Sequence, residues 1–169
     1  MVVALDALNA ETARLDGLGQ LPAQTAASLR EQGVFTRLRI DTLKNLVGVV
    51  EALGSAVFRA AVADAEQRLN GKGNIFQRLD HTADLFVAAR YPDLRAVLDA
   101  DRWQRLNEFW AMRHVFTHND GLVDARFLTK VPTSTARIGQ RLTLSEQQCR
   151  QAITDSEALC DALGDLTTP

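Results

Sequence analysis

The apolar residues of this chain recur at steps of three and four, and no other feature of the sequence constrains the fold as strongly. Between residues 34 and 70 the recurring positions are Leu43, Leu46, Val50, Leu53, Val57 and Ala61. This is the period of an α-helix that buries one face, and no proline interrupts it. We therefore expect one long helix over 34–70, in which Gly48 and Gly54 either weaken the helix or let another helix approach closely.

The same period predicts further helices along the chain. Residues 70–73 have the composition of a turn, and the helical pattern then returns over 75–89, so the two segments should form an antiparallel hairpin. Pro92 interrupts the pattern, and a short helix over 93–98 is expected after it. Asp101 is a candidate cap for a helix that runs to about residue 120, where Gly121 supplies a left-handed C-terminal residue.

The pattern fails between residues 122 and 144. Residues 132–135 have loop composition, and 138–144 are expected to be extended or to form a small hairpin. Ser145 and Gln148 then form a capping box at the start of the last helix, which should close near Gly164. The segment before Gly33 is also expected to be helical, with a break at 21–22.

These elements predict an all-α fold. We expect an up-down helical bundle with a long helical hairpin and a loop or small hairpin before the last helix. The chain of 169 residues should form one domain, in which residues 1–33 are an N-terminal helical extension and 34–164 form the bundle. The N-terminus has no signal-peptide pattern and no apolar run long enough for a membrane span, so a cytoplasmic protein without membrane contact is expected.

Charge is unevenly spread. The net charge of −2 argues against nonspecific binding to long nucleic acids. Between residues 113 and 141, however, five cations face two carboxylates, so this basic segment can contact phosphates. A solvated surface is the alternative interpretation of the same charges.

The predicted helix over 101–120 has two unlike faces. Phe109, Met112 and Phe116 fall on one side and are expected in the core. The other side carries Trp103, Asn107, Trp110, His114, Thr117 and His118, with Arg113 at its border. Tryptophan and histidine on an outward face are typical of an interface or a binding wall. The two indoles can stack on a base, but we expect them to be buried at a dimer interface.

The stretch from Arg113 to His118 resembles the R-x(4–6)-H motif of the HEPN superfamily, compact helical domains of which many are metal-independent ribonucleases. The motif lies near the end of a late helix, and an Asn-Asp-Gly exit with a Leu-Val pair follows it at 119–123. A long hairpin before the motif and a capped helix after it also fit. The resemblance extends over about 34–163.

The resemblance implies a homodimer in which two motif-bearing helices meet and form one composite cleft. His118 would act as general base or acid in attack by the ribose 2′-hydroxyl on RNA, Arg113 would stabilise the phosphate charge, and His114 would position the backbone. The products would carry 2′,3′-cyclic phosphates, and no metal or other cofactor would be needed. Trp103 and Trp110 would lie at the dimer interface.

The candidate RNA-binding residues beside these catalytic groups are Thr117, Asn119, Arg126 and Lys130. Many small ribonucleases of this kind resemble toxins or defence effectors, so an inhibitory or regulatory protein partner is also expected. The alternative within the same fold is a noncatalytic interaction or regulatory module of a toxin–antitoxin or defence system.

Two other interpretations of the motif remain open. His114 and His118 are four residues apart and can bind Zn²⁺ or Fe²⁺ if Asp120 or Asp124 completes the coordination sphere. Alternatively, Arg113 is paired with a carboxylate on a neighbouring helix, either Asp80 or Asp84, and the histidines bond to backbone. His81 shares a helix face with Asp84, and we expect it to make a surface contact only.

Overall fold

The computed structural model describes residues 10, 14, 31 and 33–166. The predicted N-terminal extension, including the break at 21–22, therefore lies almost wholly outside the described residues. From residue 33 onward the regular structure is helical, which confirms the all-α bundle. The elements in chain order are α3 (Val34–Ala61), α4 (Ala65–Leu69), the single 3-10 turn η1 (Ile75–Gln77), α5 (Leu79–Ala88), α6 (Leu94–Val97), α7 (Ala100–His118), α8 (Ala125–Lys130) and α9 (Glu146–Asp165).

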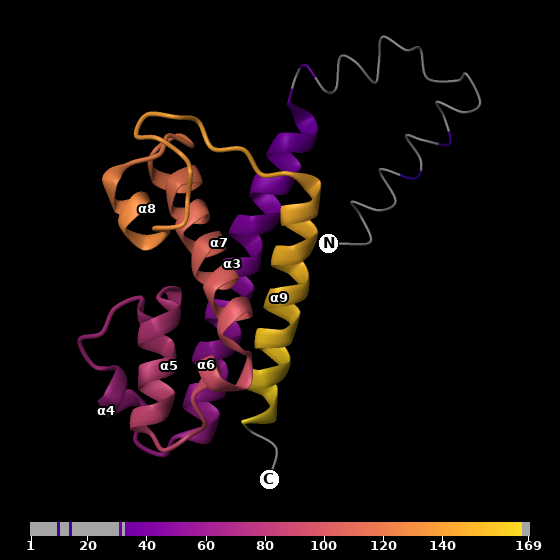
Figure 1. Ribbon diagram of the computed structural model, residues 1–169. Helices are drawn as coiled ribbons and strands as arrows, with labels where there is room; N and C mark the ends of the chain where they lie inside the picture. The colour runs from indigo at the N-terminus through magenta and orange to yellow at the C-terminus, as the bar shows by residue number, and fades with distance from the viewer. Residues whose placement is uncertain (1–9, 11–13, 15–30, 32, 167–169) are drawn as a thin grey trace.

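Three long helices form the body of the bundle. α3 and α9 lie side by side and run in the same direction, and α7 runs antiparallel against both (Figure 1). α4, α5 and α6 gather at one end of the bundle, and α8 with the loop that follows it lies at the other end, beside the last turns of α7 (Figure 1). The end of α7 is therefore framed by elements that are far apart in the sequence.

The core lies where α3, α7 and α9 meet. Phe58 is fully buried and packs edge-on against Phe86, with 5.3 Å between ring centroids. Gly54 faces this core, because a methyl group added there would meet Phe76 at 3.4 Å. The close approach expected at this glycine is thus present, whereas Gly48 faces open space.

The first helix is shorter than predicted. α3 ends at Ala61, because Val62 is extended and buried, and α4 resumes a helical path only at Ala65. The hydroxyl of Tyr91 donates to the free carbonyl of Ala61 at 2.6 Å. A contact from a distant part of the chain thus satisfies a carbonyl at the end of α3, at a point where the apolar pattern of the sequence continues without a break.

Several local predictions are confirmed and two are wrong. α6 occupies the expected short helix, and Ser145 and Gln148 form the capping box of α9. The extended segment pairs with residues 121–123 through a bridge between Leu122 and Arg141. α7, however, is capped by Asp99 rather than Asp101, and the helix α8 lies in a stretch for which no helix was expected.

Among the residues that the structure describes, no helix is long and apolar enough to cross a lipid bilayer.

Candidate functional site

The last turns of α7 carry the predicted motif. The helix ends at His118, and the amides of Asn119 and Gly121 both donate to the carbonyl of Val115, at 3.0 and 3.1 Å. Gly121 has a φ of 78°, as expected for a left-handed residue after the helix. This exit turns the chain sharply into α8 and brings the basic segment back beside the histidines.

A cleft of about 510 Å³ lies beside these turns and is lined by residues of α5, α7, α8 and the segment 74–78. Five of the predicted catalytic and RNA-binding residues line it: Arg113, His114, His118, Arg126 and Lys130. Arg78 and His81 also line it, so the cleft gathers all three histidines of the chain and four cations. Asp80 is the one carboxylate in this lining, so the charge of the cleft favours an anion over a cation.

His114 and His118 are stacked obliquely on one face of α7. Their ring centroids are 4.7 Å apart and their planes are tilted by 45°. Partial burial lowers the pKa of His114, and the nearby charge of Arg126, whose Nη1 lies 3.4 Å from the ring Nε2, lowers it further. His114 is therefore neutral near pH 7 and can accept a proton.

Arg113 lines the cleft without a counter-ion among the described residues. Its Nε is buried and has no hydrogen-bond partner in that part of the chain, and the same holds for the indole Nε1 of Trp110, one turn earlier. A buried donor without an acceptor costs about 1–3 kcal/mol. Two such donors in the lining of one cationic cleft favour a ligand that brings acceptor oxygens.

The proposed structural pairing of Arg113 is wrong. Asp80 instead accepts a hydrogen bond from the indole nitrogen of Trp103 at 2.9 Å. Asp84 forms an ion pair with Arg95, also at 2.9 Å. Both carboxylates are thus engaged elsewhere, and Arg113 is left facing the cleft.

Thr117 and Asn119, predicted as RNA-binding residues, do not line the cleft. Thr117 is exposed and is absent from the lining. The side-chain amide of Asn119 donates to Asp124. Asp124 in turn caps α8, and its bond from the Phe127 amide, 2.7 Å long, is the main cause that lowers its pKa. Asn119 therefore contributes to the start of α8 through its cap, Asp124.

The outward position predicted for the two tryptophans is also wrong. Trp103 is 7% exposed and Trp110 is 8% exposed within this single chain. Both side chains are covered by the chain itself, so no second copy is needed to bury them. Trp110 lines the cleft, whereas Trp103 bridges α7 to α5 through Asp80.

Sequence reasoning missed Arg78 and His81 as cleft residues. His81 was expected to make only a surface contact with Asp84, but Asp84 pairs with Arg95 and His81 lines the cleft. The only signal in the sequence was an arginine three residues before a histidine at the start of a helix. That pattern becomes informative only when α5 is packed against α7.

The metal-site interpretation finds no support. Among the described residues, no group of three or more histidine, cysteine, aspartate or glutamate side chains is arranged to hold a metal ion. Asp120 lies 3.3 Å from Arg141, and Asp124 caps α8, so neither completes a site with the two histidines.

Comparisons of the chain with models of protein families, with curated proteins and with solved structures found no match. The function is therefore inferred from the cleft itself.

Proposed function

We propose that the cleft binds RNA and cleaves its phosphodiester bonds without a metal ion, as a HEPN-like endoribonuclease. The observation that carries this proposal is the pair of imidazoles, 4.7 Å apart, beside an arginine without a counter-ion in a cationic cleft. Two titratable rings and one fixed cation are the groups that proton transfer around a phosphate requires.

Binding would rest on the fixed cations of the cleft. Arg78, Arg126 and Lys130 are exposed in its lining and can follow the phosphates of a short RNA segment. Arg113 is deeper and would face the reacting phosphate, because its planar guanidinium can donate two parallel bonds to phosphate oxygens. The affinity should therefore fall as salt rises.

The chemistry would be divided between the two histidines. Neutral His114 takes the proton of a ribose 2′-hydroxyl, and the 2′-oxygen attacks the adjacent phosphorus. The bond between phosphorus and the 5′-oxygen then breaks, and protonated His118 donates a proton to that leaving oxygen. Arg113 stabilises the charge that develops on the phosphoryl oxygens. The products are a 2′,3′-cyclic phosphate and a 5′-hydroxyl.

The HEPN resemblance also supports a homodimer, which we include in the proposal. Because one chain already places both imidazoles and Arg113 in its own cleft, each copy would hold a complete set of reacting groups. Pairing would then extend the RNA-binding surface. A restraining protein partner and a cytoplasmic location complete the proposal and follow from the resemblance and from the sequence pattern alone.

The test is cleavage of a fluorescent RNA oligonucleotide in excess EDTA, with products identified by mass spectrometry. Wild type should release cyclic-phosphate ends, and His114→Ala and His118→Ala should each lower the rate by about 10²–10⁴-fold. Arg37→Ala, an exposed arginine of α3 outside the cleft, should cleave like wild type. A single 2′-deoxy substitution at the cleaved position should block the reaction.

Two results would overturn the proposal. Histidine variants that cleave like wild type would show that the activity comes from a contaminant. A wild-type protein that binds the oligonucleotide but leaves it intact would contradict catalysis and favour the noncatalytic regulatory module instead.

A further inference from the structure

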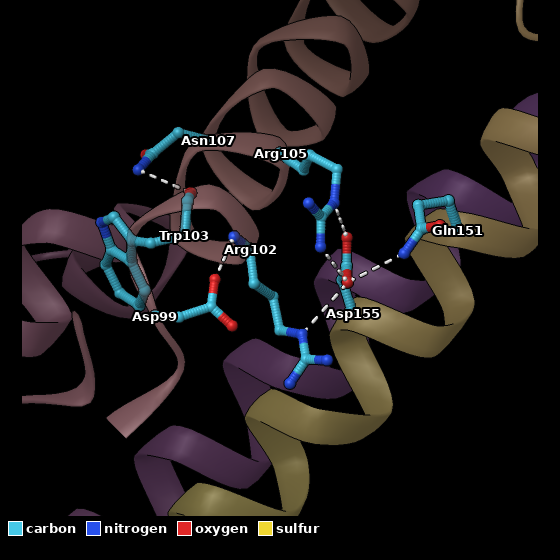
Figure 2. A network of polar contacts seen from close by, with 7 residues as sticks. All are labelled: Asp99, Arg102, Trp103, Arg105, Asn107, Gln151 and Asp155. Atoms are coloured by element: carbon cyan, nitrogen blue, oxygen red, sulfur yellow. Dashed lines mark hydrogen bonds and ion pairs between the residues drawn. The ribbon is translucent and has the colours of Figure 1, made fainter. Parts of the chain in front are cut away.

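A second hollow of about 630 Å³ adjoins the cationic cleft. The two share Asp80, Asn107 and Lys130 in their linings, so they are neighbours along α7. Trp103 and Asn107 extend from α7 on the side opposite to Arg102 and Arg105 (Figure 2). The second hollow thus lies beside the cleft, toward the first turns of the helix.

The walls of this hollow differ from those of the cleft. Pro132, which is exposed, and the small exposed parts of Trp103 and Val131 form an apolar wall that a flat ring can contact. Its one cation apart from the shared Lys130 is Arg95, which is already bonded to Asp93 and Asp84. The hollow therefore offers little to a phosphate and more to the base that the phosphate carries.

Glu108 is the one carboxylate in the lining of the hollow besides the shared Asp80, which already accepts a bond from Trp103. The side chain of Glu108 is partly buried in the lining, and it makes no hydrogen bond or ion pair with any other residue that the structure describes. A carboxylate repels phosphate and accepts only from donors, so its partner must present N–H groups. Six residues separate Glu108 from His114, which is about 9 Å along the helix, a distance that one nucleotide spans.

Building on the proposed function, we infer that this hollow is a nucleobase subsite that selects guanine through Glu108. Guanine presents two adjacent donors on its Watson–Crick edge, N1–H and the N2 amino group, which match the two oxygens of a carboxylate. Adenine and cytosine place an acceptor next to their amino group, and uracil flanks its single N–H with two carbonyls. Only guanine satisfies both carboxylate oxygens without opposing an acceptor to them.

The test is calorimetric titration of the four 3′-mononucleotides and inorganic phosphate into the full chain. Wild type should bind 3′-GMP at least about tenfold more tightly than 3′-AMP, 3′-CMP or 3′-UMP. Glu108→Gln should reduce this preference to about twofold or less while the affinity for inorganic phosphate stays unchanged. Glu157→Gln, an exposed glutamate of α9, is the matched control and should keep the preference.

The outcomes separate this inference from the function on which it rests. Equal affinity for all four nucleotides would overturn the guanine subsite and leave the phosphate cleft standing. A guanine preference that survives in Glu108→Gln would overturn the role of Glu108. If neither nucleotides nor phosphate bind, the proposed function fails and the subsite fails with it.

Discussion

The two halves of α7 hold their arginines in opposite ways. In the first half, Arg102 and Arg105 both contact Asp155, a fully buried carboxylate of α9, at 3.3 and 2.8 Å (Figure 2). Gln151 donates to the same carboxylate at 3.0 Å. In the second half, Arg113 forms no ion pair with any described residue. Its buried Nε has no hydrogen-bond acceptor there; the Nε of Arg102 also has none by hydrogen-bond geometry, but it still faces the Asp155 carboxylate at 3.3 Å.

We interpret this difference as a division of roles: the paired arginines stabilise the fold, and the unpaired arginine serves binding. The hydrogen bond that Arg105 donates to Asp155 holds the pKa of Arg105 above its usual range, and the network fixes where α7 crosses α9. The cations at the other end of the helix line a cleft with one carboxylate, Asp80, so an anion that entered the cleft would reduce their mutual repulsion. The first half should therefore matter for folding, and the second half for binding.

The largest effect is expected when the network is broken. Asp155→Asn should lower the free energy of unfolding by about 3 kcal/mol, because two arginines lose a buried counter-charge and only their exposed parts recover water. Urea unfolding followed by circular dichroism measures this. Asp161→Asn, on the exposed side of the same helix, should stay within about 0.5 kcal/mol of wild type. If Asp155→Asn also stayed within about 0.5 kcal/mol of wild type, the contrast between the two halves of α7 would fail.

The opposite sign is expected at the other end of α7. Arg113→Met keeps the aliphatic stem and removes a donor without an acceptor, so the free energy of unfolding should stay unchanged or rise by about 1 kcal/mol. The same variant should bind the RNA oligonucleotide at least about tenfold more weakly, measured by fluorescence anisotropy. A marked destabilisation would show that Arg113 serves the fold in the way that Arg105 does.

A smaller effect is expected from pH. The folded pKa of His114 lies below its ordinary value of 6.5, so the unfolded chain binds more protons on this residue. Its contribution to stability is complete above pH 6.5 and is lost as the pH falls through the folded pKa. The melting temperature of wild type should therefore fall more between pH 7 and pH 5 than that of His114→Gln. Parallel curves would contradict the burial of the neutral ring.

The features of the fold that could be predicted from the sequence are those determined by residues close together along the chain. The helical period predicted the long helices, and the spacing of Ser145 and Gln148 predicted the capping box. Both signals depend on residues that are near one another in the sequence. The end of α3 at Ala61 depends on the hydroxyl of Tyr91, thirty residues away. The six residues of α8 are too few to show a helical hydrophobic period, and the one signal for this helix in the sequence is its N-cap residue, Asp124.

The candidate site shows the same division. Helical projection grouped Trp110, Arg113 and His114 correctly, but it cannot say what covers a face. α5 and α8 cover this one, so the indoles that were expected to face a second copy are buried in their own chain. Packing also brought Arg78 and His81 to the cleft from a helix that carries no recognisable motif.

The smallest effect should come from removing one cation of the cleft rather than its centre. Arg126→Ala should raise the pKa of His114 toward its ordinary value, because the charge of Arg126 is the second cause of its lowering and burial, the first, remains. An NMR titration of the histidine ring protons measures this shift. Arg137→Ala, in the same basic segment but outside the cleft lining, should leave the titration unchanged.

Half-molar salt should narrow the difference in the pKa of His114 between wild type and Arg126→Ala, since exposed charges are screened. If neither the substitution nor the salt changes the pKa of His114, burial alone lowers this pKa, and the cations of the cleft do not act on the ring.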